Sequence, residues 1–212
     1  MKVKHEFLAN SLRFEFELDA RDIRDGFIKN DKISKYYRQI ILNPEFNRKV
    51  KEIWQILDTE YEFNEYKEKV IDEISVQLFD AAISLCRKDL TVSLEDAIIF
   101  CIMNNIQSDG THFMKLSDVE VRLLLENKKI DKAFSVILQD KDILQCINDI
   151  GRLSYRSDLR YMFLDGILCY AYYTACCLIV NELSLSLEQA VSNALEKESI
   201  LGWLNEYKEY FM

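Results

Sequence analysis

Two segments of the 212-residue chain share one pattern of residues. The segment 30–53 (NDKISKYYRQIILNPEFNRKVKEI) aligns without a gap with the segment 127–150 (NKKIDKAFSVILQDKDILQCINDI). Six positions are identical, and most of the other apolar positions stay apolar. A match of this length predicts that both segments adopt the same local structure.

Further blocks recur in the same order. Upstream, FEFEL (14–18) resembles HFMKL (112–116), and downstream DLTVSLEDAI (89–98) resembles ELSLSLEQAV (182–191). A period of about 95 residues is too long for a solenoid repeat, so the pattern favours two copies of one small helical unit. The alternative is that amphipathic helices resemble each other without a common origin.

The composition predicts a mainly α fold. Only five glycines and one proline are present, which is typical of long helices joined by short loops. We expect two pseudo-symmetric helical repeats that share one core, with short β-strands or a small hairpin where each repeat begins, because apolar residues alternate there. The boundaries are residues 1–13 for an N-terminal strand segment, 14–110 for repeat 1 and 111–212 for repeat 2 with its C-terminal helix, all in one compact domain.

Local signals place several helix starts. Asn43 followed by Pro44 predicts an N-cap and the first helical residue, and Asp140 takes the place of Asn43 in the second copy. Ser93 with Asp96, and Ser186 with Gln189, fit the capping-box pattern. These serines are therefore expected to begin the last helix of each repeat, which explains the recurring 89–98 and 182–191 blocks without an active site.

The sequence carries no pattern typical of an enzyme. It has two histidines, no CxxC or HExxH motif and no glycine-rich phosphate loop, so we predict no catalytic residue, no cofactor and no metal ligand. The six cysteines lie in apolar helical patterns, and the chain shows no secretory signal, which indicates free buried thiols. An enzyme without a recognisable local motif is the weakest alternative.

Charge and hydropathy limit the partners. A net charge of −9 disfavours nucleic acid, whose phosphates are bound by clustered Lys and Arg, and permits a basic protein. The segment 166–180 carries no charge over fifteen residues, fewer than the roughly 20 that span a bilayer. We expect it to be a core helix of a cytoplasmic protein that does not enter membranes.

The most acidic segment, 58–73, carries seven acids and two lysines. It has three interpretations: a solvated helix face, a surface that meets a basic partner, or a segment that pairs with arginines of the second copy (Arg152, Arg156 and Arg160). The partner hypothesis assigns protein binding to Asp58, Glu60, Tyr61, Glu62, Glu65, Tyr66 and Glu68.

The function that we favour is a non-enzymatic, acidic protein-binding module that inhibits or neutralises a partner. Bacterial toxin-immunity proteins and phage-encoded inhibitors of host defence are similar in size and composition. The alternative is a structural or regulatory helical homo-oligomer, such as a homodimer, formed through tyrosines of the 166–180 stretch and the C-terminal aromatics. The C-terminal aromatics Trp203, Tyr207, Tyr210 and Phe211 lie largely on one side of the last helix. Packing against the body of the chain is the preferred interpretation, and an aromatic anchor for another chain is the alternative.

Overall fold

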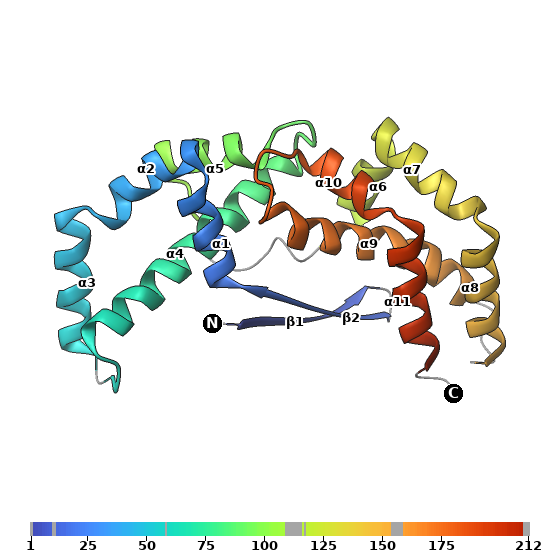
Figure 1. Ribbon diagram of the computed structural model, residues 1–212, viewed down its shortest axis with the longest axis horizontal. Coiled ribbons are helices and arrows are strands. Elements are labelled where there is room, and N and C mark those ends of the chain that lie inside the picture. The colour runs from blue at the N-terminus through green and yellow to red at the C-terminus, as the bar shows by residue number, and fades with distance from the viewer. Residues whose placement is uncertain are drawn as a thin grey trace. The chain divides into compact units, whose positions relative to one another are not determined.

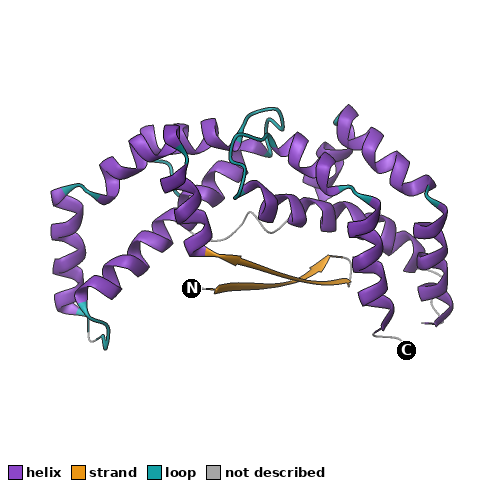
Figure 2. Cartoon of the chain, in the orientation of Figure 1, coloured by secondary structure: helices purple, strands orange, loops and turns teal. Residues whose placement is uncertain are grey.

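The computed structural model describes residues 2–9, 12–57, 59–108, 116, 118–153 and 159–209. Within these residues the chain is mainly helical, with eleven helices and one two-stranded sheet (Figures 1 and 2). The elements are β1 (Lys2–Ala9), β2 (Leu12–Asp19), α1 (Ala20–Lys29), α2 (Asp31–Ile41), α3 (Pro44–Ile56), α4 (Phe63–Cys86), α5 (Leu94–Met103), α6 (Asp118–Glu126), α7 (Lys128–Gln139), α8 (Lys141–Leu153), α9 (Leu159–Ile179), α10 (Leu187–Ala194) and α11 (Lys197–Glu209).

The chain divides into two compact units. Unit 1 contains α1 to α5 together with the segment 179–186, and unit 2 contains α6 to α8, most of α9, α10 and α11. Each unit has its own buried side chains, and a core shared by the repeats stays a prediction. The strands β1 and β2 agree with the alternating N-terminal pattern. The strand expected at the start of repeat 2 falls on residues 112–115, which lie outside the described residues.

Asparagine side chains begin the helices of the recurring segments. Asn30 accepts from the backbone N–H groups of Lys32 and Ile33, and Asn127 makes the same two contacts one repeat later. Asn43 accepts from the backbone N–H of Glu45, with Pro44 at the first helical position, as predicted.

The start of α5 also confirms its predicted cap. The Ser93 hydroxyl accepts from the backbone N–H of Asp96 at 3.1 Å. Ser93 forms an isolated antiparallel bridge with Ser186, and the next two amides of α5 donate to carbonyls of the segment 179–186. The first turn of α5 is therefore satisfied by its cap and by the backbone of this segment. The capping box at Ser186 and Gln189 stays a prediction.

The core of unit 1 forms around α4, which packs against α1, α3 and α5. Tyr37 of α2 is fully buried and meets Phe27 edge to face at 5.4 Å. Its hydroxyl lies 2.5 Å from Ser75 Oγ, which itself donates to the Ile71 carbonyl, so Tyr37 is the donor. Burial raises the pKa of Tyr37 to about 12, which keeps this donor protonated.

In unit 2, the C-terminal helix packs on its own unit. Trp203 of α11 is buried, stacks on Tyr170 with ring centroids 5.0 Å apart, and also contacts Phe163. Tyr172 and Tyr173 of α9 are buried as well. The interpretation of the C-terminal aromatics as internal packing is thus confirmed for Trp203, whereas Tyr210 and Phe211 lie outside the described residues. The prediction of a core helix within 166–180 is confirmed too.

All six cysteines are free thiols, as predicted, and five of them are buried, whereas Cys177 is half-buried. Burial raises the pKa of Cys86 to about 12 and those of Cys101 and Cys177 to about 11. Because the thiolate is the reactive form, Cys86 and Cys101 act as small apolar groups of the core.

Two glycines offer a matched test of the packing of unit 1. A Cβ added to Gly26 of α1 would lie 2.9 Å from the Val180 carbonyl oxygen, whereas one added to Gly202 of α11 would meet nothing within 4 Å. We expect Gly26→Ala to lower the free energy of unfolding by about 1–3 kcal/mol, because the backbone contact must open. Gly202→Ala should raise it by about 0.5–1 kcal/mol through helix propensity alone.

Urea denaturation of both variants measures this difference. Stabilisation by Gly26→Ala as large as that by Gly202→Ala would show that the close approach of α1 to Val180 contributes nothing.

Candidate functional site

A buried glutamate joins two helices of unit 1. Glu95 of α5 is 6% exposed and accepts from Asn30 Nδ2 at 2.7 Å and from Lys32 Nζ at 2.5 Å. The hydrogen bond from Lys32 is the main cause that lowers the pKa of Glu95. Asn30 also caps α2 with its Oδ1, so one side chain starts α2 and fastens it to α5.

Unit 2 contains the same arrangement. Glu188 of α10 is buried and accepts from Asn127 Nδ2 at 3.0 Å and from Lys129 Nζ at 2.8 Å. The Lys129 hydrogen bond is again the main cause that lowers the pKa of the carboxyl. Because this buried cluster is present in both units and forms helix-to-helix contacts, we assign it to structure. A functional site is better sought where the units differ.

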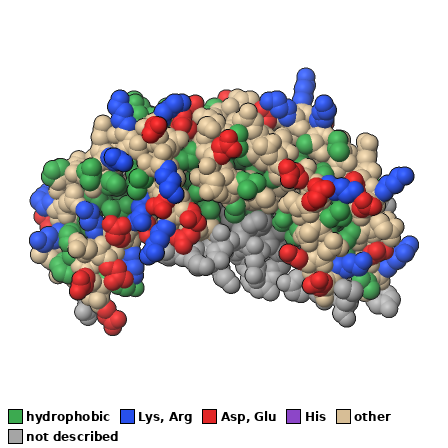
Figure 3. Space-filling view, in the orientation of Figure 1, with side chains coloured by type: hydrophobic (Ala, Val, Ile, Leu, Met, Phe, Trp, Pro, Cys, Tyr) green, Lys and Arg blue, Asp and Glu red, His purple; other side chains and the backbone are tan. Residues whose placement is uncertain are grey.

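The predicted acidic site lies at the loop between α3 and α4 and on the first turns of α4. Glu60 and Glu62 are exposed, and Glu62 precedes α4 without capping it through its side chain. Glu65 is exposed and pairs with Lys69 at 3.7 Å. Figure 3 shows Asp and Glu side chains gathered at the lower left, where Figure 1 places this loop. Asp58 lies outside the described residues.

Tyr61 is held in the centre of this loop. Its backbone carbonyl accepts from Trp54 Nε1 at 2.9 Å, and Lys69 Nζ lies 3.0 Å from the centroid of its ring. Trp54 also packs on Phe63, with ring centroids 5.6 Å apart. These contacts fix the loop to the end of α3 while 42% of Tyr61 stays exposed.

Two other residues of the predicted protein-binding set, Tyr66 and Glu68, are less available to a partner. Tyr66 is half-buried. Glu68 pairs with Arg24 of α1 at 2.5 Å, and Arg24 also pairs with Asp72 at 3.0 Å. Asp72 is buried, so the acidic surface is narrower than the segment 58–73. The alternative pairing of this segment with second-copy arginines stays a prediction, because Arg156 and the side chain of Arg160 lie outside the described part.

Sequence reasoning missed the apolar part of this surface. Ile53, Ile56 and Leu57 at the end of α3 are 50%, 85% and 48% exposed. The available signal was the apolar pair Ile56-Leu57 directly before the acidic segment. We define the α3–α4 surface as the exposed apolar and acidic side chains of this region: Ile53, Ile56, Leu57, Glu60, Tyr61, Glu62 and Glu65.

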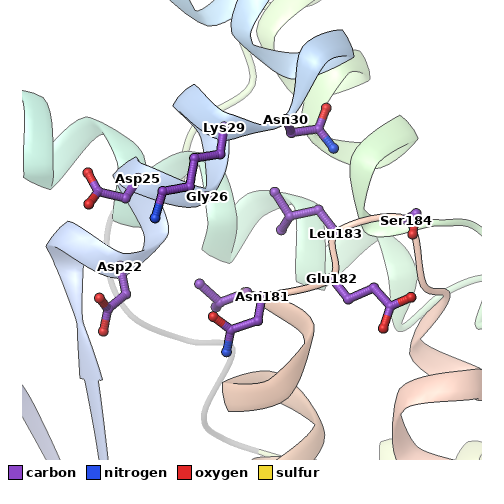
Figure 4. A pocket seen from close by; sticks show the side chains of 10 residues that line it. Asp22, Asp25, Gly26, Lys29, Asn30, Asn181, Glu182, Leu183 and Ser184 are labelled. Carbon is purple, nitrogen blue, oxygen red and sulfur yellow. The ribbon is translucent and has the colours of Figure 1, made fainter.

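A polar pocket of about 330 Å³ lies elsewhere in unit 1 (Figure 4). Asp22, Asp25 and Lys29 line it from α1, and Asn181 and Glu182 line it from the segment that follows α9. No histidine or cysteine lines this pocket, so it offers no base next to a thiol nucleophile. Its charged lining consists of three carboxylates and one ammonium group, from Asp22, Asp25, Glu182 and Lys29.

Among the residues that the structure describes, no three or more His, Cys, Asp and Glu side chains form a group that could hold a metal ion. Nor is any helix in the described part both long and apolar enough to cross a membrane. Comparisons with family models, curated proteins and solved structures gave no match to the chain.

Proposed function

We propose that the chain is a non-enzymatic protein-binding module that inhibits or neutralises a basic partner protein through the α3–α4 surface. The observation that carries this proposal is the combination of exposed apolar side chains with acids. Ile56, Leu57 and Tyr61 form the apolar part, and Glu60 and Glu62 lie next to them in the chain.

Protein–protein interfaces commonly combine apolar and charged side chains, as the α3–α4 surface does. Apolar and aromatic side chains near the centre supply affinity when they lose water, whereas charges at the rim select the partner and speed association. Tyr61 is already held by Trp54 and Lys69, so little of its conformational freedom remains to be lost on binding.

We also propose that the two units arose by duplication of one helical unit. The gapless match of 30–53 with 127–150 supports this, as does the burial of Glu95 and Glu188 against equivalent Asn and Lys side chains. In this proposal, the function of unit 1 came to differ from that of unit 2 after the duplication, and the α3–α4 surface carries this difference.

Charge reversal tests the proposed surface. The triple variant Glu60→Lys, Glu62→Lys, Glu65→Lys should reduce capture of a basic protein from a lysate of the source cell by at least about tenfold, because attraction becomes repulsion. High salt should weaken capture by the unmodified protein, since it screens exposed charges. Quantitative mass spectrometry of the captured protein measures both effects.

The control carries the same change in net charge at exposed acids elsewhere, Glu126→Lys, Glu196→Lys and Glu206→Lys. Capture should survive in this control. Equal loss in both triple variants would indicate a general charge effect and contradict a site at the α3–α4 surface.

A further inference from the structure

Helix α8 of unit 2 is covered by the C-terminal helix. Figure 1 shows α11 lying alongside α8, and the two helices are in direct contact. Ile143, Ile147 and Ile150 of α8 are all buried, with exposed fractions of 0 to 1%. Helix α8 thus lies between neighbours of its own unit, which include α7 and α11.

The counterpart of α8 in unit 1 is α3, and no helix of the described residues covers it as α11 covers α8. Helix α3 packs on α2 and α4, and the residues described after α5, 104–108, contain no helix. Of the three isoleucine positions, only Val50 is buried, whereas Phe46 is half-buried and Ile53 is half exposed. Among the described residues, the face that α11 covers on α8 is therefore open at Ile53 on α3.

Two lysines fasten α11 to α8. Lys197 Nζ lies 2.9 Å from Asp140 Oδ2 and 2.5 Å from Asp142 Oδ2, at the start of α8. Lys208 Nζ lies 3.2 Å from Asp149 Oδ2, two turns further along α8. The lysines are eleven residues apart, and the apolar side chains of α11 that are buried lie between them.

Helix α3 keeps acids at the two corresponding positions. In the gapless alignment, Glu45 takes the place of Asp142, and Glu52 takes the place of Asp149. Both carboxylates are more than half exposed, and their ion pairs within the described residues are with cations about one turn away, such as Arg48. Exposed pairs of this kind contribute little, so both carboxylates are available to cations of another helix.

One position of α3 differs in charge from its counterpart on α8, and this difference predicts the charge of the side chain that would contact it. Cys146 of α8 donates to Asn205 Oδ1 of α11 at 3.5 Å. Its counterpart on α3 is Lys49, which is exposed. Suppose that a helix lies on α3 as α11 lies on α8. Its residue at the position of Asn205 would then contact Lys49, and a carboxylate there would pair with the lysine.

We propose that this open face of α3 binds an amphipathic helix of the partner protein. We call it the α3 face and define it as Glu45, Lys49, Glu52, Ile53 and Ile56. The partner helix carries Lys or Arg eleven residues apart, apolar side chains between them, and an acid where α11 has Asn205. The inference rests on the proposed function, since it names the element of the partner that is recognised.

A peptide with the sequence of residues 196–209 and the change Asn205→Asp is the probe. It is capped at both ends, labelled with a fluorophore and titrated with the full-length protein, and binding is followed by fluorescence anisotropy. In the protein, α8 is already covered by its own helix α11. Saturable binding of the peptide would therefore indicate that it binds another, open surface. We expect Glu45→Lys with Glu52→Lys to weaken binding by about tenfold or more, and Ile53→Asp to do the same.

Two controls locate the binding. Val119→Asp and Val136→Asp change exposed apolar side chains of unit 2 and should leave the affinity unaltered. A second peptide in which Lys197→Glu and Lys208→Glu are added should bind the Glu45→Lys, Glu52→Lys protein better than the unmodified protein. This exchange of preference cannot come from misfolding of the variant.

Two results would overturn the inference: no saturable binding of the first peptide, or binding that the α3 variants leave unchanged. If the peptide fails while the triple charge reversal at Glu60, Glu62 and Glu65 still abolishes partner capture, the proposed function stands and only the helical form of the partner is wrong.

Discussion

Replacement of Arg24 by methionine is expected to lower the free energy of unfolding of unit 1 by about 3 kcal/mol at neutral pH. Arg24 pairs with Asp72, whose side chain is 9% exposed, and removing one partner of a buried pair leaves an uncompensated charge. Methionine keeps most of the apolar stem of the arginine, so the fall in the free energy of unfolding measures the effect of removing the charge. Urea denaturation of the full-length protein measures the effect.

Two companion variants separate the buried pair from the exposed one. Adding Asp72→Asn to Arg24→Met should restore most of the lost stability, because no unpaired charge remains. Glu68→Gln, which removes the exposed partner of Arg24, should cost under about 1 kcal/mol. An equal loss from Glu68→Gln and Arg24→Met would show that Asp72 is not the important partner.

The destabilisation by Arg24→Met should shrink as the pH falls. Burial raises the pKa of Asp72, and Arg24 partly opposes that rise, so the variant raises the pKa further. An acid with a raised folded-state pKa destabilises the folded chain above its unfolded pKa of about 4 and stops doing so once it is protonated. The difference between variant and unmodified protein should therefore be smaller at pH 4 than at pH 7.

Loss of the carboxylate in either buried Asn–Lys–Glu cluster should have similar consequences in the two units. We expect Glu95→Gln to destabilise unit 1, and Glu188→Gln to destabilise unit 2, by about 1.5–3 kcal/mol each, since both remove charge-assisted hydrogen bonds. Hydrogen exchange resolved by residue can follow the two units separately. A large loss in one unit with none in the other would contradict an equivalent role for the two glutamates.

The pH dependence of these variants has the opposite sign to that of Arg24→Met. The pKa values of Glu95 and Glu188 are lowered, mainly by hydrogen bonds from Lys32 and Lys129. A carboxyl with a lowered pKa contributes stability above its unfolded value of about 4.3, and this contribution is lost as the pH falls through the folded-state pKa. Each Gln variant should therefore approach the unmodified protein in stability below about pH 4.

Local signals in the sequence predicted much of the fold. Asn43 and Ser93 cap helices as expected, because a cap depends on residues within three positions of it. The mainly helical class followed from composition, and the free thiols followed from the apolar helical patterns in which the cysteines lie. The pairing of Asn30 and Lys32 with Glu95 was not predicted, although all three residues belong to recurring blocks, because it joins positions more than 60 residues apart.

The candidate site was harder to predict for the same physical reason. The segment 58–73 was identified by its charge, yet burial removes Asp72 from its surface and Arg24 engages Glu68. Exposure of Ile53 depends on which helix lies beside α3, and its counterpart Ile150 is fully buried although the residue type is the same. Sequence pattern alone does not distinguish a covered apolar position from an open one.

Photo-crosslinking from position 56 tests the central claim most directly. A photoreactive amino acid replaces Ile56, and in a matched control it replaces Val136, which is 65% exposed on α7. Irradiation in the source cell should link one basic protein to position 56, with the label on a helical segment of that protein, and should not link it from position 136. Crosslinking of the same proteins from both positions, or of none from position 56, would contradict binding through the α3–α4 surface.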